Sequence, residues 1–209
     1  MSGASDYVAN LLGRWVTGQQ PMAPLPQVWM ALFATVPHDD GSAGTELAGN
    51  GYGRAQVAGQ LEASEDVPNG AVLSFEAVPA WIVPGMTVFN TDNPGGLTAG
   101  QVVLGVDAIN NTVTLDQPIN DPVVTGDVIA FSAFGDPSGS APSLFGNVGP
   151  IVFPLTTVPG PGTAYGWGFF DAPTGGNLLI SDVLAGGAQV IAGNVSATFA
   201  ADQLILSIT

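Results

Sequence analysis

The residue types that support catalysis are sparse in this chain, and its single histidine is the first place to look for chemistry. His38 stands directly before Asp39 and Asp40. A hydrolytic triad would need a nucleophile held by this base, and the hydroxyls of Ser42 and Thr45 are close to it only along the chain. One histidine without any cysteine leaves only carboxylates as further zinc ligands. We therefore expect an ordinary loop histidine, and a protein that is neither an enzyme nor the holder of a cofactor or metal.

A glycine-rich segment, GTELAGNGYGR at residues 44–54, has the composition of a phosphate-binding loop. No lysine follows it, no strand-to-helix transition is expected there, and its surroundings are acidic, so phosphate binding is not favoured. Glu46 and Arg54 are an acid and the only base of this region, and we expect them to form an ion pair that fixes the loop. The glycines that permit its positive-φ turns are Gly49, Gly51 and Gly53.

Aspartates gather with asparagines in the middle of the chain. Calcium prefers such oxygen ligands, but the spacing does not match the 12-residue loop that ends in a bidentate glutamate. Asp and Asn also favour the backbone angles of turns, and solvated turn residues are the preferred interpretation. No pair of these carboxylates stands in a recognisable glycosidase context. The aspartates are Asp92, Asp107, Asp116, Asp121 and Asp127.

Aromatic residues offer two further interpretations, a sugar-stacking face or the filling of cores and subunit interfaces. We expect Trp15 and Trp29 in a core or an interface, and Trp81, between two prolines, as an exposed contact. Tyr7, Leu11 and Trp15 fall on one stripe at helical spacing, and Trp167 lies in an apolar run.

Composition sets the class of protein. The 209 residues include 29 glycines and 17 prolines, which argues against a helical bundle, while 46% are hydrophobic, enough for a core. The net charge is −15, lysine is absent, and Arg14 and Arg54 are the only arginines, so neither nucleic acid nor an anionic membrane is an expected partner. Charged residues make up only 9%, so much of the surface must consist of uncharged polar and small residues or be covered by partner subunits. The second option suggests an assembly. No export signal or membrane-spanning run is recognisable, so we expect synthesis in the cytoplasm of the producing cell.

The pattern of elements predicts one helix followed by many short strands. Ser5 can cap a helix over residues 5–17, and a proline-rich arm leads from it to a buried strand at 27–35. Short strands alternate with turns over residues 72–134, and a terminal hairpin is expected from 196–200 and 203–209 through Ala201 and Asp202.

These elements predict a mainly β fold, with an antiparallel β-sandwich or jelly-roll-like core, one N-terminal helix and an inserted small β-barrel module. We expect a helix and arm at 1–26, a discontinuous core domain at 27–60 plus 139–209, and the inserted module at 61–138.

Two stretches carry a resemblance to a known family. Residues 28–54 (VWMALFATVPHDDGSAGTELAGNGYGR) form the first, and residues 166–184 (GWGFFDAPTGGNLLISDVL) with 192–208 form the second. Together they resemble small virion proteins of tailed bacteriophages of the tail-fibre or head-fibre type. GMTV at 85–88 and GDVIAFS at 126–132 are similar to a β-module inserted into many phage structural proteins.

The resemblance implies a structural protein on the virion surface, a fibre or spike subunit or a capsid decoration. It implies a homo-oligomer, with a trimer favoured, that contacts capsid, collar or tail proteins. The alternative is a host-surface adhesin whose middle module binds carbohydrate. The residues expected to serve in structure or interfaces are Tyr7, Leu11, Trp15, Trp29, Glu46, Arg54, Trp81 and Trp167.

Overall fold

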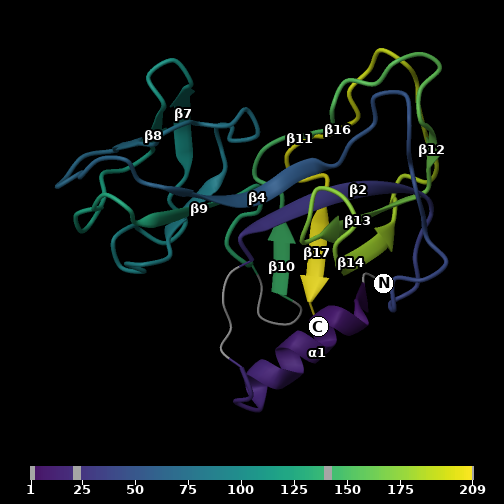
Figure 1. Ribbon diagram of the computed structural model, residues 1–209, viewed down its shortest axis with the longest axis horizontal. Helices are drawn as coiled ribbons and strands as arrows, with labels where there is room; N and C mark the ends of the chain where they lie inside the picture. Colours follow the sequence, from purple (N-terminus) through teal and green to yellow (C-terminus); the bar gives the residue numbers. More distant parts are fainter. Residues whose placement is uncertain (1–2, 21–24, 139–142, 209) are drawn as a thin grey trace. The chain divides into compact units, whose positions relative to one another are not determined.

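The computed structural model describes residues 3–20, 25–138 and 143–208 (Figure 1). Two compact units divide the chain. Unit 1 comprises Met1–Gln56 and Val152–Thr198, and unit 2 comprises Val57–Ile151 and Phe199–Thr209. The predicted fold class is confirmed, because the described chain is mainly antiparallel β with one helix, as in a β-sandwich. The predicted domain boundaries stay a prediction, and the one at 139, like Pro21 and Pro24 of the arm, falls outside the described residues.

The helix α1 (Asp6–Val16) begins where the sequence predicts a cap. The Ser5 hydroxyl accepts a hydrogen bond from the N–H of Val8 at 3.3 Å, and Asp6 in the first turn complements the helix dipole. At the other end the hydroxyl of Thr17 donates to the carbonyl of Gly13 at 2.8 Å. Gly18 follows with a φ of 73°, a left-handed conformation that glycine adopts without strain and that ends the helix.

Unit 1 contains an antiparallel sheet whose centre is the predicted apolar strand. In spatial order its strands are β1 (Gly3–Ala4), β14 (Leu178–Val183), β13 (Gly166–Phe170) and β2 (Gln27–Thr35), with β3 (Thr45–Glu46) also paired to β2. Trp167 lies opposite Leu32 in the register of β13 and β2, and Gly168 opposite Ala31. A side chain at Gly168 would meet the Phe33 ring at 2.8 Å, so a glycine there allows the core of Ala31, Phe33 and Leu178 to close.

A second, smaller ribbon completes unit 1. Strand β12 (Gly162–Ala164) pairs with β15 (Gln189–Ile191) in antiparallel register. Two further short strands, β11 (Ile151–Val152) and β16 (Thr198–Phe199), lie where the chain passes from one unit to the other, and they pair with each other.

The strands of unit 2 form two antiparallel sets of three, of which the second is a sheet of its own, and a two-stranded ribbon. The first set has the order β4 (Ala55–Glu62), β9 (Val128–Ser132), β6 (Thr87–Asn90), and the second has the order β5 (Val72–Ser74), β8 (Thr112–Leu115), β7 (Val103–Asp107). The ribbon pairs β10 (Ser143–Gly146) with β17 (Ile205–Ile208). These strands include all five that the sequence predicts between residues 72 and 134.

Isolated bridges connect the two sheets of unit 2 at both ends. Ala63, after β4, bridges to Phe75, after β5, and Thr87 of β6 bridges to Val102, before β7. Apolar side chains between the sheets are almost fully buried: Leu73, Val88, Val103, Val113, Leu115, Ile129 and Phe131. Because single bridges rather than continuous ladders join the sheets, the closed small barrel stays a prediction.

The predicted terminal hairpin is wrong. Strand β16 pairs with β11, and β17 pairs with β10, so the two last strands do not pair with each other. The physical reason is Asn147, which is fully buried and binds the connecting segment on both sides. Its amide nitrogen donates to the carbonyl of Ala200, and its amide oxygen accepts the N–H of Leu204, both at 2.8 Å. These bonds redirect the chain into a separate ribbon.

Candidate functional site

The most elaborate side-chain arrangement of the described chain surrounds Arg54 in unit 1. Its guanidinium group forms a bidentate ion pair with Glu46, with Nε at 2.9 Å from Oε1 and Nη2 at 2.7 Å from Oε2. The arginine side chain is 5% exposed and the glutamate side chain 28%. The ion pair expected from the sequence is therefore present, and its fork geometry makes it a strong charge-assisted contact.

Arg54 also binds the turn that follows β13. Its Nη1 donates to the carbonyls of Ala172 and Gly175, each at 2.8 Å, and its Cζ lies 3.6 Å from the centre of the Phe170 ring. A guanidinium over an aromatic face gains a cation–π contact. One residue thus joins β3 to the turn after β13.

The turn itself is closed by Asp171. Its carboxylate accepts hydrogen bonds from the backbone N–H and the side-chain amide of Asn177, both at 2.7 Å. Gly176 occupies a position where a side chain would lie 2.5 Å from the Asp171 carboxylate, and its φ is 74°. This geometry requires the GGN sequence of the turn. The sequence analysis treated GGN only as part of a family motif.

Tyr52 completes the arrangement on the side of β2. Its hydroxyl accepts the N–H of Leu32 at 2.8 Å and donates to Glu46 at 3.3 Å, and its ring stacks on Phe153 with the centroids 6.3 Å apart. Burial raises the pKa of Tyr52 well above its usual range, because the phenolate would be poorly solvated there. The sequence analysis missed Tyr52 and Phe170 as members of this cluster, although both lie within the stretches that it quoted, 28–54 and 166–184.

Four of the five N–H groups of Arg54 are used by these contacts, and its charge is balanced by Glu46. The arrangement is suited to holding two loops together. We assign it a structural role in unit 1.

The His38 loop has the geometry of a turn. The backbone N–H of His38 donates to the carbonyl of Ser42 at 2.9 Å, and the Asp40 carboxylate accepts the N–H of Ser42 at 2.8 Å. This hydrogen bonding with Ser42 holds the pKa of Asp40 below its usual range. All three residues are exposed.

Some aspartates of unit 2 connect the end of β6 to the start of β9, and Asp107 acts within one turn. Asp92 accepts the N–H of Val128 at 2.7 Å, and Asp127 accepts the amide of Asn90 at 2.9 Å. Hydrogen bonds from Asn110 hold the pKa of Asp107 below its usual range. Among residues 3–20, 25–138 and 143–208, no cluster of three or more acidic or histidine side chains could hold a metal ion.

The tryptophans are placed differently from one another. Trp167 is 4% exposed and lies 5.1 Å from Phe169, between ring centres, in the core of unit 1. Trp29 is half-buried, and its indole N–H donates to Gln27 at 3.0 Å. Trp81, expected as an exposed contact, is instead half-buried, because its ring packs edge-on against Phe131 at 6.3 Å.

The N-terminal helix is the least covered element. None of its residues is buried; Tyr7 is 38% and Trp15 48% exposed, and Leu11 is half-buried. Trp15 is therefore not a core residue of this chain. Leu12 and Val16, which lie on the same apolar stripe, are 37% and 75% exposed.

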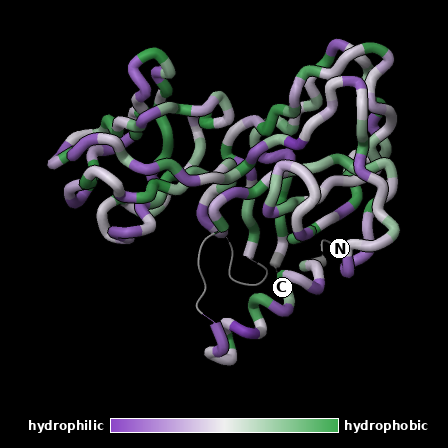
Figure 2. Tube along the Cα trace, viewed as in Figure 1, coloured by the Kyte–Doolittle hydropathy of each residue, from purple (hydrophilic) through white to green (hydrophobic). Residues whose placement is uncertain are grey.

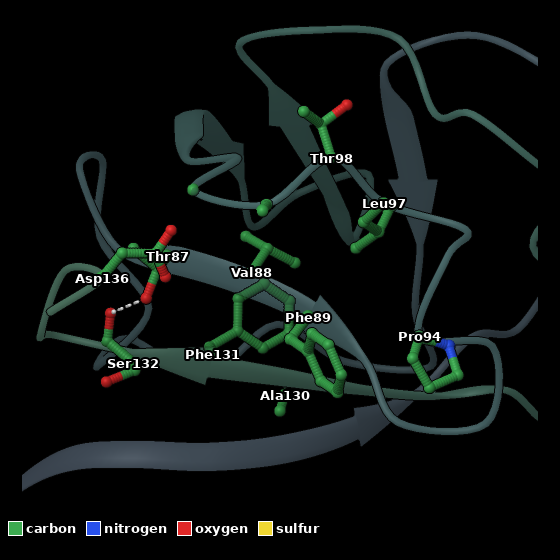
Figure 3. Close-up of a pocket in the computed structure, with 12 residues that line it drawn as sticks. Thr87, Val88, Phe89, Pro94, Leu97, Thr98, Ala130, Phe131, Ser132 and Asp136 are labelled. Atoms are coloured by element: carbon green, nitrogen blue, oxygen red, sulfur yellow. Dashed lines mark hydrogen bonds between the residues drawn. The ribbon is translucent and has the colours of Figure 1, made fainter.

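A pocket of about 250 Å³ lies beside β6 and β9 in unit 2 (Figure 3). Phe89, 46% exposed, and Pro94 and Leu97 form much of its apolar lining. Thr98 and Asp136 provide polar groups on its wall. The sequence analysis did not single out these residues, since β6 and the segment 94–100 are brought together only by the fold.

Comparison with known proteins identifies the class. A family model described as "Podophage GP4 fiber I protein gp80" matches residues 3–133 and 127–207. These matches span most of the chain, which therefore belongs to this family of podophage fibre proteins. The predicted resemblance to tailed-phage fibre proteins is confirmed. The chain is thus a fibre structural protein of the virion, and it associates with other virion components.

No curated protein matches the chain. In the part of the chain that the structure describes, no helix is long and apolar enough to cross a membrane.

Proposed function

We propose that this protein is a non-enzymatic fibre subunit exposed on the surface of the phage particle, where it assembles as a homo-oligomer, with a trimer favoured. In this proposal β-rich units pack around a symmetry axis or on an underlying shell. The N-terminal helix and its arm dock onto neighbouring subunits. A position in a fibre, a spike base or a capsid decoration layer would use the same contacts.

The observation that carries this proposal is the exposed apolar stripe of α1 in a member of a fibre-protein family. Large apolar side chains gathered on one surface mark a site of protein contact. The composition supports assembly as well, because only 9% of residues are charged and close packing between subunits then desolvates few charges.

Exposure on the particle can be tested with antibodies raised against the purified protein. We expect them to label intact, purified virions at regular positions in electron micrographs. Absence of labelling on intact particles, with labelling after the particles are disrupted, would contradict surface exposure. Absence of the protein from purified virions would contradict the virion role itself.

A second candidate is binding of host-surface carbohydrate by unit 2, and the pocket beside β6 favours it. An exposed aromatic ring can stack on the apolar face of a sugar, as Phe89 would. A carboxylate such as Asp136 can accept hydrogen bonds from sugar hydroxyls. Asp136 is one of the residues that line this pocket.

Binding to an array of soluble glycans tests this second candidate. We expect binding of a glycan that the natural chain recognises to be lost in the Phe89→Ala variant. Binding should be retained in the Leu104→Ala variant, since Leu104 is exposed on another strand of the same unit. A binding signal that survives Phe89→Ala, or no signal on the array, would contradict a sugar site in this pocket.

A further inference from the structure

The first turn of α1 is attached firmly to unit 1. Ser5 is 3% exposed, and its N–H donates to the carbonyl of Leu179 at 2.9 Å. The N–H of Asp6 donates to the carbonyl of Asp39 at 2.9 Å, and β1 pairs with β14 just before the helix. The direction of the helix is thus set by its own chain.

The rest of α1 is capped at its C-terminal end and is largely exposed to solvent. The hydroxyl and the N–H of Thr17 both donate to the carbonyl of Gly13, at 2.8 and 3.1 Å, so the C-terminal end is capped. Figure 2 shows hydrophobic positions along this helix. We call five of its apolar residues, each exposed or half-buried, the α1 stripe: Tyr7, Leu11, Leu12, Trp15 and Val16.

A helix of this kind needs a partner. Isolated helices shorter than about 12 residues are marginal in water, and most helices in proteins are stabilised by packing of their apolar face. The helix has 11 residues, and no residue of it is buried by its own chain. Packing of this apolar face against another molecule would therefore stabilise the helix further.

The distribution of charge favours a second copy of the same chain as that molecule. Asp6 and Arg14 are the only charged side chains among residues 1–38, so the whole net charge of −15 lies in residues 39–209. Two such copies repel each other over most of their surfaces. Their contact costs the least electrostatic free energy where that charge is absent. The α1 stripe contains no charged side chain, although Asp39 and Asp40 line a pocket together with Tyr7 at its N-terminal end. An apolar stripe is complementary to itself.

We propose that the α1 stripes of neighbouring copies pack against one another and hold the homo-oligomer together, so that in a trimer the three α1 helices surround the symmetry axis. This inference rests on the proposed oligomeric function and names its contact surface. The polar side of the helix, which includes Asn10, then faces solvent.

Two variants with the same added charge test the inference. Leu12→Glu places a carboxylate in the stripe, and Asn10→Glu places one on the opposite side of the same helix. We expect Leu12→Glu to weaken association at least about tenfold, because a carboxylate would have to be desolvated without a partner. Asn10→Glu should associate like the natural chain. Urea unfolding should show the same stability for both variants when dissociated, since both positions are exposed.

The absence of cysteine allows a direct distance test. Leu12→Cys should form disulfide-linked dimers in the assembled protein under mild oxidation, and Asn10→Cys should not. Leu12 lies near the middle of α1, so neighbouring copies bring it together in either helix direction.

The outcomes separate the inference from the proposed function. A trimer that is unaffected by Leu12→Glu and fails to cross-link through Leu12→Cys overturns the α1 contact while leaving an oligomeric fibre subunit. In that case the stripe would face another virion protein. A natural chain that remains a monomer at all concentrations overturns both.

Discussion

Arg54 shows how one side chain can replace many weaker contacts in a loop-rich protein. Its bidentate pair with Glu46, its two carbonyl contacts and its stacking on Phe170 all lie at one buried position. A lysine would keep the charge and lose the fork and the planar stacking, so the two bases are not equivalent there.

Arg54→Ala should lower the free energy of unfolding by about 3 kcal/mol, because it leaves the largely buried carboxylate of Glu46 without its partner. Urea denaturation checks this. Arg14→Ala removes the other arginine, which is exposed on α1, and should change the stability by less than about 0.5 kcal/mol. Equal effects of the two substitutions would contradict the structural role of Arg54.

Tyr52 makes a pH-dependent contribution to stability. Its pKa is raised in the folded protein by burial, so the folded state keeps the proton when the unfolded chain loses it above pH of about 10. Stability from this group is therefore fully present below that pH and falls as the pH rises further. Tyr52→Phe should be less stable at neutral pH by about 1 to 2 kcal/mol, since the N–H of Leu32 loses its acceptor.

The measurement is the difference in unfolding free energy between the natural chain and Tyr52→Phe as a function of pH. We expect a constant difference between pH 7 and 9 and a smaller one above pH of about 10. A difference that grows with alkaline pH would contradict burial of the neutral phenol.

At the scale of elements, Asn147 determines how the end of the chain is paired. Its side chain binds the carbonyls of Gly149 and Ala200 and the N–H of Leu204. Asn147→Ala should cost about 2 kcal/mol and speed amide exchange at Leu204, because buried groups would lose their partners. Asn110→Ala, at an exposed turn, is the control. Unchanged protection at Leu204 would contradict this role.

Local pattern predicts some elements well. The strand Gln27–Thr35 has the predicted bounds, and α1 differs from its prediction by one residue at each end, because an apolar run between prolines and a capped amphipathic stripe are local signals. The strand β10 was missed, since its partner β17 lies some sixty residues further along the chain. Strand pairing over such distances depends on tertiary contacts such as those of Asn147.

The candidate sites also divide into features with a local sequence signal and features that only the fold brings together. The pairing of Glu46 with Arg54 could be predicted because charges of opposite sign are so rare in this chain. The pocket beside β6 could not be predicted, since Phe89 and Asp136 are joined only by the packing of unit 2. Exposure of Trp81 was expected from its neighbouring prolines, but the Phe131 ring provides it with a partner.

At the scale of the whole molecule, the charge of −15 should oppose assembly. Salt screens repulsion between exposed charges, with a Debye length of about 10 Å at 0.1 M and about 3 Å at 1 M. We therefore expect association between copies to strengthen as sodium chloride rises from 0.02 to about 0.5 M, as measured by sedimentation equilibrium. Weakening with salt would point to ion pairs between subunits and contradict an uncharged contact surface.

The solution mass of the purified chain, measured by light scattering, tests the central claim of a self-assembling fibre subunit most directly. The full chain should have about three times its monomer mass of 21.1 kDa, and a chain lacking residues 1–26 should be a monomer. A full chain that stays monomeric across the concentration range would contradict self-assembly.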